Sequence, residues 1–446
     1  MTLSKLNLRQ YLKRLPRAVL NLTIRPLSRL APRRRGWWVF GHQGDVFAGN
    51  AKYLFLWISI HRPDMRAVWL TDNRQTRDQI RQAGLAAYTR WSPGGMIAAL
   101  RAKVFAYCHG VEDANLHLSG GAYLLNLWHG VGLKATMFGD ANGVVSSAQK
   151  YGRNWLSRQF FLEYLIPPDA VVTTSPFMQA HFADQFRLPA ERCPQLGYSR
   201  LDVGLDGALK RQSRVIDEAG GFAFNPRGYS EVYIYMPTFR DTGRPFLAQA
   251  LPDLERLSKA LQARNALLYV KLHRRTRAED IAAYENIERW PEGVDFYTYL
   301  DDFSVMITDY SSVLYDYIFS NDRGVILYTF DYDEYLKRDR SLLYPFDENT
   351  AGLRVGSFDA LVAALASGEA LAEPEGAAEI RRKFWGAERA PASPRIISYV
   401  DGALGADHRS VTPALGGSTR QVSGVRAITA TPHDGVRSYV TERGSS

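Results

Sequence analysis

Residues 305–319 read Val-Met-Ile-Thr-Asp-Tyr-Ser-Ser-Val-Leu-Tyr-Asp-Tyr-Ile-Phe, which predicts a strand, a turn and a helix in succession. The apolar run 305–307 is typical of a buried strand, and the apolar residues after the turn recur at helical spacing. Asp309, Ser311 and Ser312 fall where the helix begins and can cap its free backbone N–H groups. Because these groups and the helix dipole attract anions, the turn is a candidate phosphate site. Taken alone, the pattern is more typical of a plain helix cap.

Short apolar runs alternate with helical stretches on both sides of this unit. Strands are predicted at 37–40, 67–70, 86–88, 104–107, 123–128 and 171–174, and again at 232–235, 267–270, 305–307 and 325–328. Such alternation predicts an α/β fold with parallel, doubly wound sheets. Asn50 is expected to cap the helix that follows the first strand.

A glycine-rich connection at 203–230 separates the two series of strands. We therefore expect two domains, 37–202 and 231–400, with a cleft between them. In such folds ligands bind beyond the carboxyl ends of the strands, and domain interfaces are preferred pocket sites. Residues 401–446 are rich in Gly, Ser, Thr and Ala and are predicted to form a mostly disordered tail.

The basic charge of the chain is concentrated at its N-terminus. Residues 1–36 contain ten Lys or Arg and no acidic residue, which leaves 45 basic against 46 acidic residues in the remainder. This near-neutral body argues against nucleic acid as a partner. Cys108 and Cys193 are the only cysteines, which excludes a disulfide framework and favours a reduced, cytosolic setting. No apolar run reaches the ~18–20 residues that span a bilayer, and no signal peptide is indicated.

Leucines and other apolar residues alternate with the basic residues of segment 1–36. This pattern predicts an amphipathic helix on an anionic membrane surface, at the cytoplasmic face. A helix that packs on the body with a solvated basic face is the alternative, and the lack of acidic residues favours the membrane. Pro16 and Pro26 are expected to divide the segment.

Polar motifs follow the predicted strands of both domains. They contain His129 and Lys134, Arg200 and Asp202, Arg240, His273 with Arg274 and Arg275, and Asp309 with Ser311 and Ser312. One histidine at a strand end is usually structural, and Arg200 and Asp202 are expected to pair with each other at the domain hinge. Two histidines, several cations and two serines at strand ends of two domains favour one anionic ligand in the cleft.

The motif His-Gly-Val-Gly-Leu-Lys at 129–134 resembles the His-Gly-Thr-Pro-Leu-Lys motif of the CDP-glycerol glycerophosphotransferase family, the teichoic acid primases and polymerases. Further similar segments occur at 50–54, 197–202, 237–241, 271–273, 308–317 and 328–335, and the resemblance covers about residues 37–385. The sequence departs from the family pattern at Val131-Gly132 and at Arg274, which follows His273.

The resemblance implies a GT-B fold, with two Rossmann-like domains facing a cleft and the nucleotide on the C-terminal domain. It implies transfer of a polyol phosphate from a CDP-linked donor to a hydroxyl of a membrane-associated acceptor. Glycerol phosphate is the favoured group. CMP is released, and the product is a teichoic-acid-like or capsule polymer. The acceptor is expected to be lipid-linked or polymeric. CDP-glycerol and CDP-ribitol are not distinguished, and no metal is demanded.

The resemblance also assigns roles to residues. His129 is expected to be the catalytic base, and His273 to contact the donor phosphates or assist the leaving group. The residues expected to bind the donor phosphates are Ser311, Ser312, Arg240 and Arg275. Asp316 is expected to bind the ribose, and Lys134 is expected to lie on the acceptor side. For Asp316, an ordinary exposed helix carboxylate is an equal alternative. For the whole chain, the alternatives are a nucleotide-sugar glycosyltransferase of the same fold and an inert membrane-surface scaffold.

Overall fold

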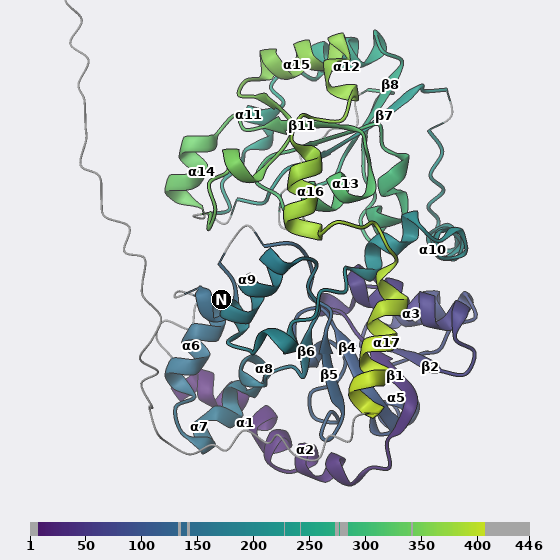
Figure 1. The fold of residues 1–446 in the computed structure, drawn as a ribbon, viewed down its shortest axis with the longest axis vertical. Helices are drawn as coiled ribbons and strands as arrows, with labels where there is room; N and C mark the ends of the chain where they lie inside the picture. Colours follow the sequence, from purple (N-terminus) through teal and green to yellow (C-terminus); the bar gives the residue numbers. More distant parts are fainter. Residues whose placement is uncertain are drawn as a thin grey trace, which may run out of the picture.

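The computed structural model of the chain has two α/β lobes, one above the other in Figure 1. It describes residues 8–132, 135–140, 143–226, 228–240, 242–272, 276, 284–339 and 342–405. Each lobe contains a six-stranded sheet whose paired strands are all parallel. This confirms the α/β class with doubly wound parallel sheets.

The first sheet has the strand order β3-β2-β1-β4-β5-β6. Its strands are β1 Arg34–Phe40, β2 Arg66–Leu70, β3 Ala87–Tyr88, β4 Ala102–Tyr107, β5 Tyr123–Asn126 and β6 Ala170–Val171. The helices α3 Gly49–His61, α4 Arg74–Gln82 and α5 Pro93–Arg101 connect its first four strands. The strand order reverses direction between β1 and β4, and such a point is where ligands bind in open α/β sheets.

The second sheet repeats this topology with the order β12-β11-β10-β7-β8-β9. Its strands are β7 Glu231–Met236, β8 Ala266–Val270, β9 Ile287–Arg289, β10 Val305–Thr308, β11 Gly324–Tyr328 and β12 Leu353–Val355. The helices around it are α11 Leu247–Ala250, α12 Leu254–Gln262, α13 Val313–Ser320, α14 Tyr332–Arg338, α15 Phe358–Ser367 and α16 Ala377–Trp385. Here the strand order reverses between β7 and β10. The stretch 305–319 contains β10 and most of α13, so it forms one side of this point in the sheet.

The N-terminal segment forms α1 Leu8–Leu22 and α2 Ile24–Leu27. One side of α1 packs on the turn at 159–161, which lies between α7 Trp155–Arg158 and α8 Leu162–Leu165. Arg14 pairs with Glu163 at 2.7 Å, and Asn21 donates to the carbonyl of Gln159. Pro16 lies inside α1, so the expected break there is wrong. A proline costs the helix a hydrogen bond to the carbonyl of Leu12, and Leu12 is exposed, so water can reach that side of the helix.

Two helices lie in or near the segments expected to border the domains. The connection 203–230 contains α10 Gly207–Ala219, and α17 Ala392–Gly405 runs back along the first lobe (Figure 1). Asp202 accepts hydrogen bonds from the backbone N–H groups of Ala392 and Ser393, both at 2.7 Å. The expected Arg200–Asp202 pair is therefore wrong, because Asp202 caps α17. α17 continues to Gly405, past the expected start of the tail at 401, and the rest of the predicted tail, 406–446, lies outside the described residues.

The remaining helices of the first lobe are α6 Val144–Tyr151 and α9 Pro176–Phe186. Ser175 caps α9 by accepting from the N–H of Met178. Across the described ranges, no helix combines the length and the apolar character needed to cross a bilayer.

Candidate active site

A cavity of about 200 Å³ lies between the two domains, where strand ends from both sheets meet. The first domain lines it with residues 128–132 and Thr136, and the second with Thr238 and residues 310–312. Thr238 follows β7 and Tyr310 follows β10, so the cavity lies at the reversal of the second sheet. The cavity thus brings together His129, Ser311 and Ser312, which the sequence predicts to share one site.

A strained turn presents His129 to the cavity. Trp128, directly before it, has φ of 54°, a left-handed conformation that costs a non-glycine residue about 1–2 kcal/mol. Asn126 holds this turn by accepting from the N–H of Trp128 at 2.8 Å. The amide of Asn50 donates to the carbonyls of Leu127 and Trp128 at 3.0 and 2.9 Å. The Asn50 side chain therefore stabilises the turn. It is not the expected cap of α3, which begins at Gly49.

Two further histidines adjoin His129, and sequence reasoning missed both. His42 follows β1 and His109 follows β4, so they flank the reversal of the first sheet. The rings of His109 and His129 stack with centroids 4.5 Å apart, and those of His42 and His109 meet edge to face at 5.0 Å. Their position after strands on either side of the reversal is the signal that would have found them. Within the described ranges, no group of His, Cys, Asp or Glu side chains has the arrangement of a metal site.

The surroundings of His129 favour the neutral form of its imidazole. The residue is exposed and lines the cavity, and one face of its ring stacks on His109. Loss of solvation and then the neighbouring His109 lower the pKa of His129 well below its ordinary value, and Arg200 and His42 act in the same direction. A neutral imidazole has a lone pair that can accept a proton from a hydroxyl.

Arg200 joins His129 to the second domain. Its Nη1 donates to the carbonyl of His129 at 2.7 Å, and its Nη2 pairs with Asp316 Oδ2 of α13 at 2.6 Å. The hydroxyl of Tyr297 donates to the same carboxylate oxygen at 2.5 Å. Asp316 is 1% exposed and does not line the cavity, so the alternative of an ordinary exposed helix carboxylate is wrong, while its expected contact with the ribose stays a prediction. Gly130 lies in this junction, and a Cβ there would be 3.4 Å from Ser312 Oγ.

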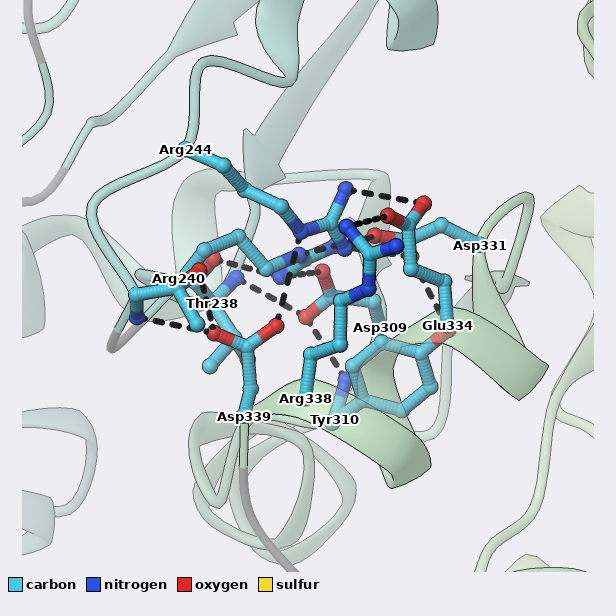
Figure 2. Close-up of polar contacts among 10 residues, drawn as sticks. Thr238, Arg240, Arg244, Asp309, Tyr310, Asp331, Glu334, Arg338 and Asp339 are labelled. Carbon is cyan, nitrogen blue, oxygen red and sulfur yellow. Dashed lines mark hydrogen bonds and ion pairs between the residues drawn. The ribbon is translucent and has the colours of Figure 1, made fainter.

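Arg240 lies behind the cavity in a buried ionic cluster (Figure 2). Its Nε and Nη2 donate to both oxygens of Asp331 at 2.9 Å, and its Nη1 donates to Asp309 at 3.0 Å and to the carbonyl of Thr238 at 2.6 Å. The side chain is fully buried and all its nitrogens are engaged, so it does not line the cavity as a donor-phosphate ligand would. Asp309 in turn accepts from the backbone N–H groups of Thr238 and Tyr310. The cluster therefore fixes two walls of the cavity.

Ser311 and Ser312 lie at the start of α13 and line the cavity. Ser311 Oγ accepts weakly from the N–H of Val313 at 3.4 Å, and Ser312, the residue before the helix, makes no side-chain cap bond. The first N–H groups of α13 and its dipole favour an anion at this place. His273, Arg275 and Lys134 lie outside the described residues, as does Arg274, so their roles stay predictions.

One departure from the family motif has a local cause. A Cβ on Gly132 would lie 2.8 Å from Nε2 of His181, which is too close for a proline or any other larger residue without movement of that ring. His181 itself is held by the hydroxyl of Tyr344 at 2.8 Å. Glycine at this position therefore allows the loop after His129 to pack against α9.

Two Rossmann-like domains whose strand ends meet at a shared cavity define the GT-B class. Residues 27–401 match the family described as CDP-Glycerol:Poly(glycerophosphate) glycerophosphotransferase, and the chain belongs to this family.

Similar proteins support the fold and the family. The teichoic acid poly(glycerol phosphate) polymerase of Staphylococcus epidermidis is 24% identical over 69% of this chain and 42% of its own length. The teichoic acid ribitol-phosphate primase of Bacillus spizizenii is 28% identical over 41% of this chain and 46% of its own. The chain thus spans less than half the length of these relatives. The solved structure of the wall teichoic acid polymerase TagF superposes with a TM-score of 0.66 at 19% identity, covering 90% of this chain and 99% of that one.

Proposed function

We propose that this chain transfers a polyol phosphate from a CDP-linked donor to a hydroxyl of an acceptor and releases CMP. Among polyol phosphates, we favour glycerol phosphate as the transferred group. The product is a teichoic-acid-like or capsule polymer. The observation that carries the proposal is the cavity in which a neutral His129 meets the serines at the start of α13. Family membership and relatives that are named for glycerol- and ribitol-phosphate transfer support it.

The chemistry follows from the two walls of the cavity. His129 Nδ1 faces the carbonyl oxygen of Cys108 at 3.4 Å, so Nε2 accepts the proton of the acceptor hydroxyl as its oxygen bonds to the β-phosphorus of the donor. The bond from that phosphorus to the bridging oxygen breaks, and CMP departs with the bond electrons. Ser311, Ser312 and the first N–H groups of α13 stabilise the charge on the phosphate oxygens, a contribution that dominates phosphoryl transfer. His273 is predicted to assist the leaving group.

The acceptor is proposed to be lipid-linked or polymeric and to be met at an anionic membrane surface, on the cytoplasmic face. Leu12, Leu15 and Val19 recur on one face of α1 and are 57%, 46% and 47% exposed. Trp155 and Leu156 of the adjacent α7 are also exposed, at 69% and 56%. An exposed apolar face flanked by basic residues, with its other side anchored on the protein, fits interfacial binding.

The test is CMP release by the purified chain from CDP-glycerol, with an oligo(glycerol phosphate) acceptor. CDP-ribitol, UDP-glucose and GDP-mannose serve as competing donors. His129→Ala is expected to reduce turnover at least ~100-fold, the usual contribution of a general base. His61→Ala is the matched control, because His61 pairs with Asp206 on the surface of the first domain. Turnover of a nucleotide sugar, with none of either CDP-polyol, would establish the glycosyltransferase alternative instead.

A further inference from the structure

A second cavity, of about 220 Å³, lies in the first domain. Asp72, which follows β2, and Trp91, which follows β3, line it, so it lies at the carboxyl edge of the first sheet. Arg17 of α1 lines its other side. The cavity is therefore placed between α1 and the carboxyl ends of β2 and β3. We propose that it binds a pyranose ring of the acceptor, a site that rests on the proposed polyol phosphate transfer.

An exposed aromatic face is available for the sugar ring. Trp91 is 46% exposed, and its ring lies 5.9 Å from that of His117 at an interplanar angle of 32°. Indole offers a large apolar face, on which the C–H groups of a pyranose can pack while the hydroxyls point to polar neighbours. Because the site is formed by a tryptophan at its rim and polar side chains within, it suits a ring that is apolar on its faces and polar at its edge.

The charges of the cavity favour hydroxyl groups over phosphate. Asp72, Glu112 and Glu163 contribute three carboxylates. The two arginines are already paired: Arg90 lies 2.6 Å from Asp45 and 2.7 Å from Asp72, and Arg17 lies 3.7 Å from Glu163. A phosphate would meet carboxylates and no unpaired cation among these described lining residues. Sugar hydroxyls, in contrast, can donate to carboxylate oxygens and cost less to desolvate than an ion.

Three residues that line the same cavity carry buried polar atoms without a hydrogen-bond partner. Within the described part of the chain, Asn115 Nδ2, Glu163 Oε2 and His117 Nδ1 have no hydrogen-bond partner. Asn115 is 3% exposed and the side chain of Glu163 is 4% exposed. Buried polar atoms of a folded protein are normally satisfied, so a ligand with several hydroxyl groups would complete their bonding.

The cavity is connected to the active site by one short loop. Glu112 lies in the turn Val111–Asp113, directly after His109 and Gly110. Asp113 holds the loop by accepting from the backbone N–H groups of Cys108 and His109 at 3.2 and 2.9 Å. His109 stacks on His129. The loop that contributes to the sugar site therefore also supports the catalytic histidine, and an acceptor seated in the cavity would lead its chain toward His129.

Binding can be measured without catalysis. Saturation-transfer difference NMR on the full chain, with octyl β-N-acetylglucosaminide below its micellar concentration, is expected to show ring-proton signals. Trp91→Ala should abolish them and Trp91→Phe should keep them, since phenylalanine retains an aromatic face. Ile97→Ala is the control, because Ile97 is a 55% exposed apolar residue of the neighbouring α5 that does not line the cavity. Absence of the signals in the unchanged protein, or their persistence in Trp91→Ala, would overturn the proposal.

Kinetics separate a failed sugar site from a failed transfer function. With CDP-glycerol as donor, Trp91→Ala is expected to raise the KM of a saccharide-bearing glycerol phosphate acceptor about tenfold, equivalent to ~1.4 kcal/mol. The KM of CDP-glycerol and that of an acceptor without sugar should stay unchanged. Equal losses with both acceptors, or displacement of the octyl glycoside by oligo(glycerol phosphate), would assign the cavity to phosphate instead. No turnover with any acceptor would refute the transfer function, while the NMR measurement still decides the sugar site.

Discussion

Arg200 and Asp316 form an ion pair of 2.6 Å across the interface between the two domains, and both side chains are buried. Arg200 comes from the turn Ser199–Gly204 of the first domain and Asp316 from α13 of the second. The same guanidinium donates to the carbonyl of His129. Since α13 begins with the serines of the cavity, the Arg200 side chain connects His129, the proposed base, to the proposed anion site.

Replacement of Arg200 should separate its structural role from its positioning role. Arg200→Met alone leaves the Asp316 carboxylate buried without its partner, which is expected to cost about 3–5 kcal/mol of unfolding free energy. In the double variant Arg200→Met/Asp316→Leu, urea denaturation should show that most of this stability returns. The kcat should stay reduced ~100-fold, because the contact to the His129 carbonyl is still missing and small misplacement of a catalytic group is costly. Recovery of kcat together with stability would contradict a positioning role.

Arg240 should stabilise the cavity walls and not bind the donor directly. Arg240→Met leaves Asp309 and Asp331 buried, with Asp309 losing its cation, so we expect a loss of about 3–5 kcal/mol in unfolding free energy. Arg244→Met is the matched control, because Arg244 is 15% exposed and a milder loss is expected. Normal stability in Arg240→Met, with a raised KM for CDP-glycerol alone, would restore the direct phosphate role that the resemblance implies.

The pH profile should report the neutral state of His129. In the proposed mechanism the neutral form is the base, so activity should be lost as pH falls through the pKa of His129, which lies well below 6.5. The kcat/KM for CDP-glycerol is therefore expected to stay level from pH 8 to below pH 6.5, because this ratio follows ionisations of the free enzyme.

Removal of His109 should shift the acid side of the pH profile. His109→Ala takes away a group that lowers the pKa of His129, so the acid limb should shift to higher pH. His61→Ala should leave the limb in place. An acid limb near pH 6.5 in the unchanged protein, insensitive to His109→Ala, would contradict the assignment.

Local sequence patterns predicted the strands that are buried on both faces, because continuous apolar runs mark them. They missed β9 and β12, which are three residues long and have the sequences Ile-Glu-Arg and Leu-Arg-Val. Both are edge strands, where one side of the strand is not covered by a neighbour and polar residues are tolerated. Short mixed segments of this kind are not distinguished from loops by periodicity.

The cavity was predictable where residues lie at strand ends, as His129, Ser311 and Ser312 do. The contacts that support these residues could not be predicted, because the residues that form them are far apart in the sequence. Arg200 and Asp316 are separated by 116 positions, and Arg240 and Asp331 by 91. Sequence spacing alone does not distinguish an arginine that binds a ligand from one that is buried between two carboxylates, and only the fold decides between them.

The exposed face of α1 should determine membrane binding. Leu12→Glu/Val19→Glu replaces two exposed apolar residues with acidic ones, while Arg14 and Asn21 keep α1 on the body. Cosedimentation with vesicles containing phosphatidylglycerol is expected to weaken at least ~10-fold, since apolar burial and attraction to anionic lipid are both reduced. CMP release with a water-soluble acceptor should be unchanged. Ile97→Glu, the same change at an exposed position on α5, should bind vesicles normally. Undiminished binding by the double variant would exclude this face as the membrane surface and favour the helix as a purely structural element.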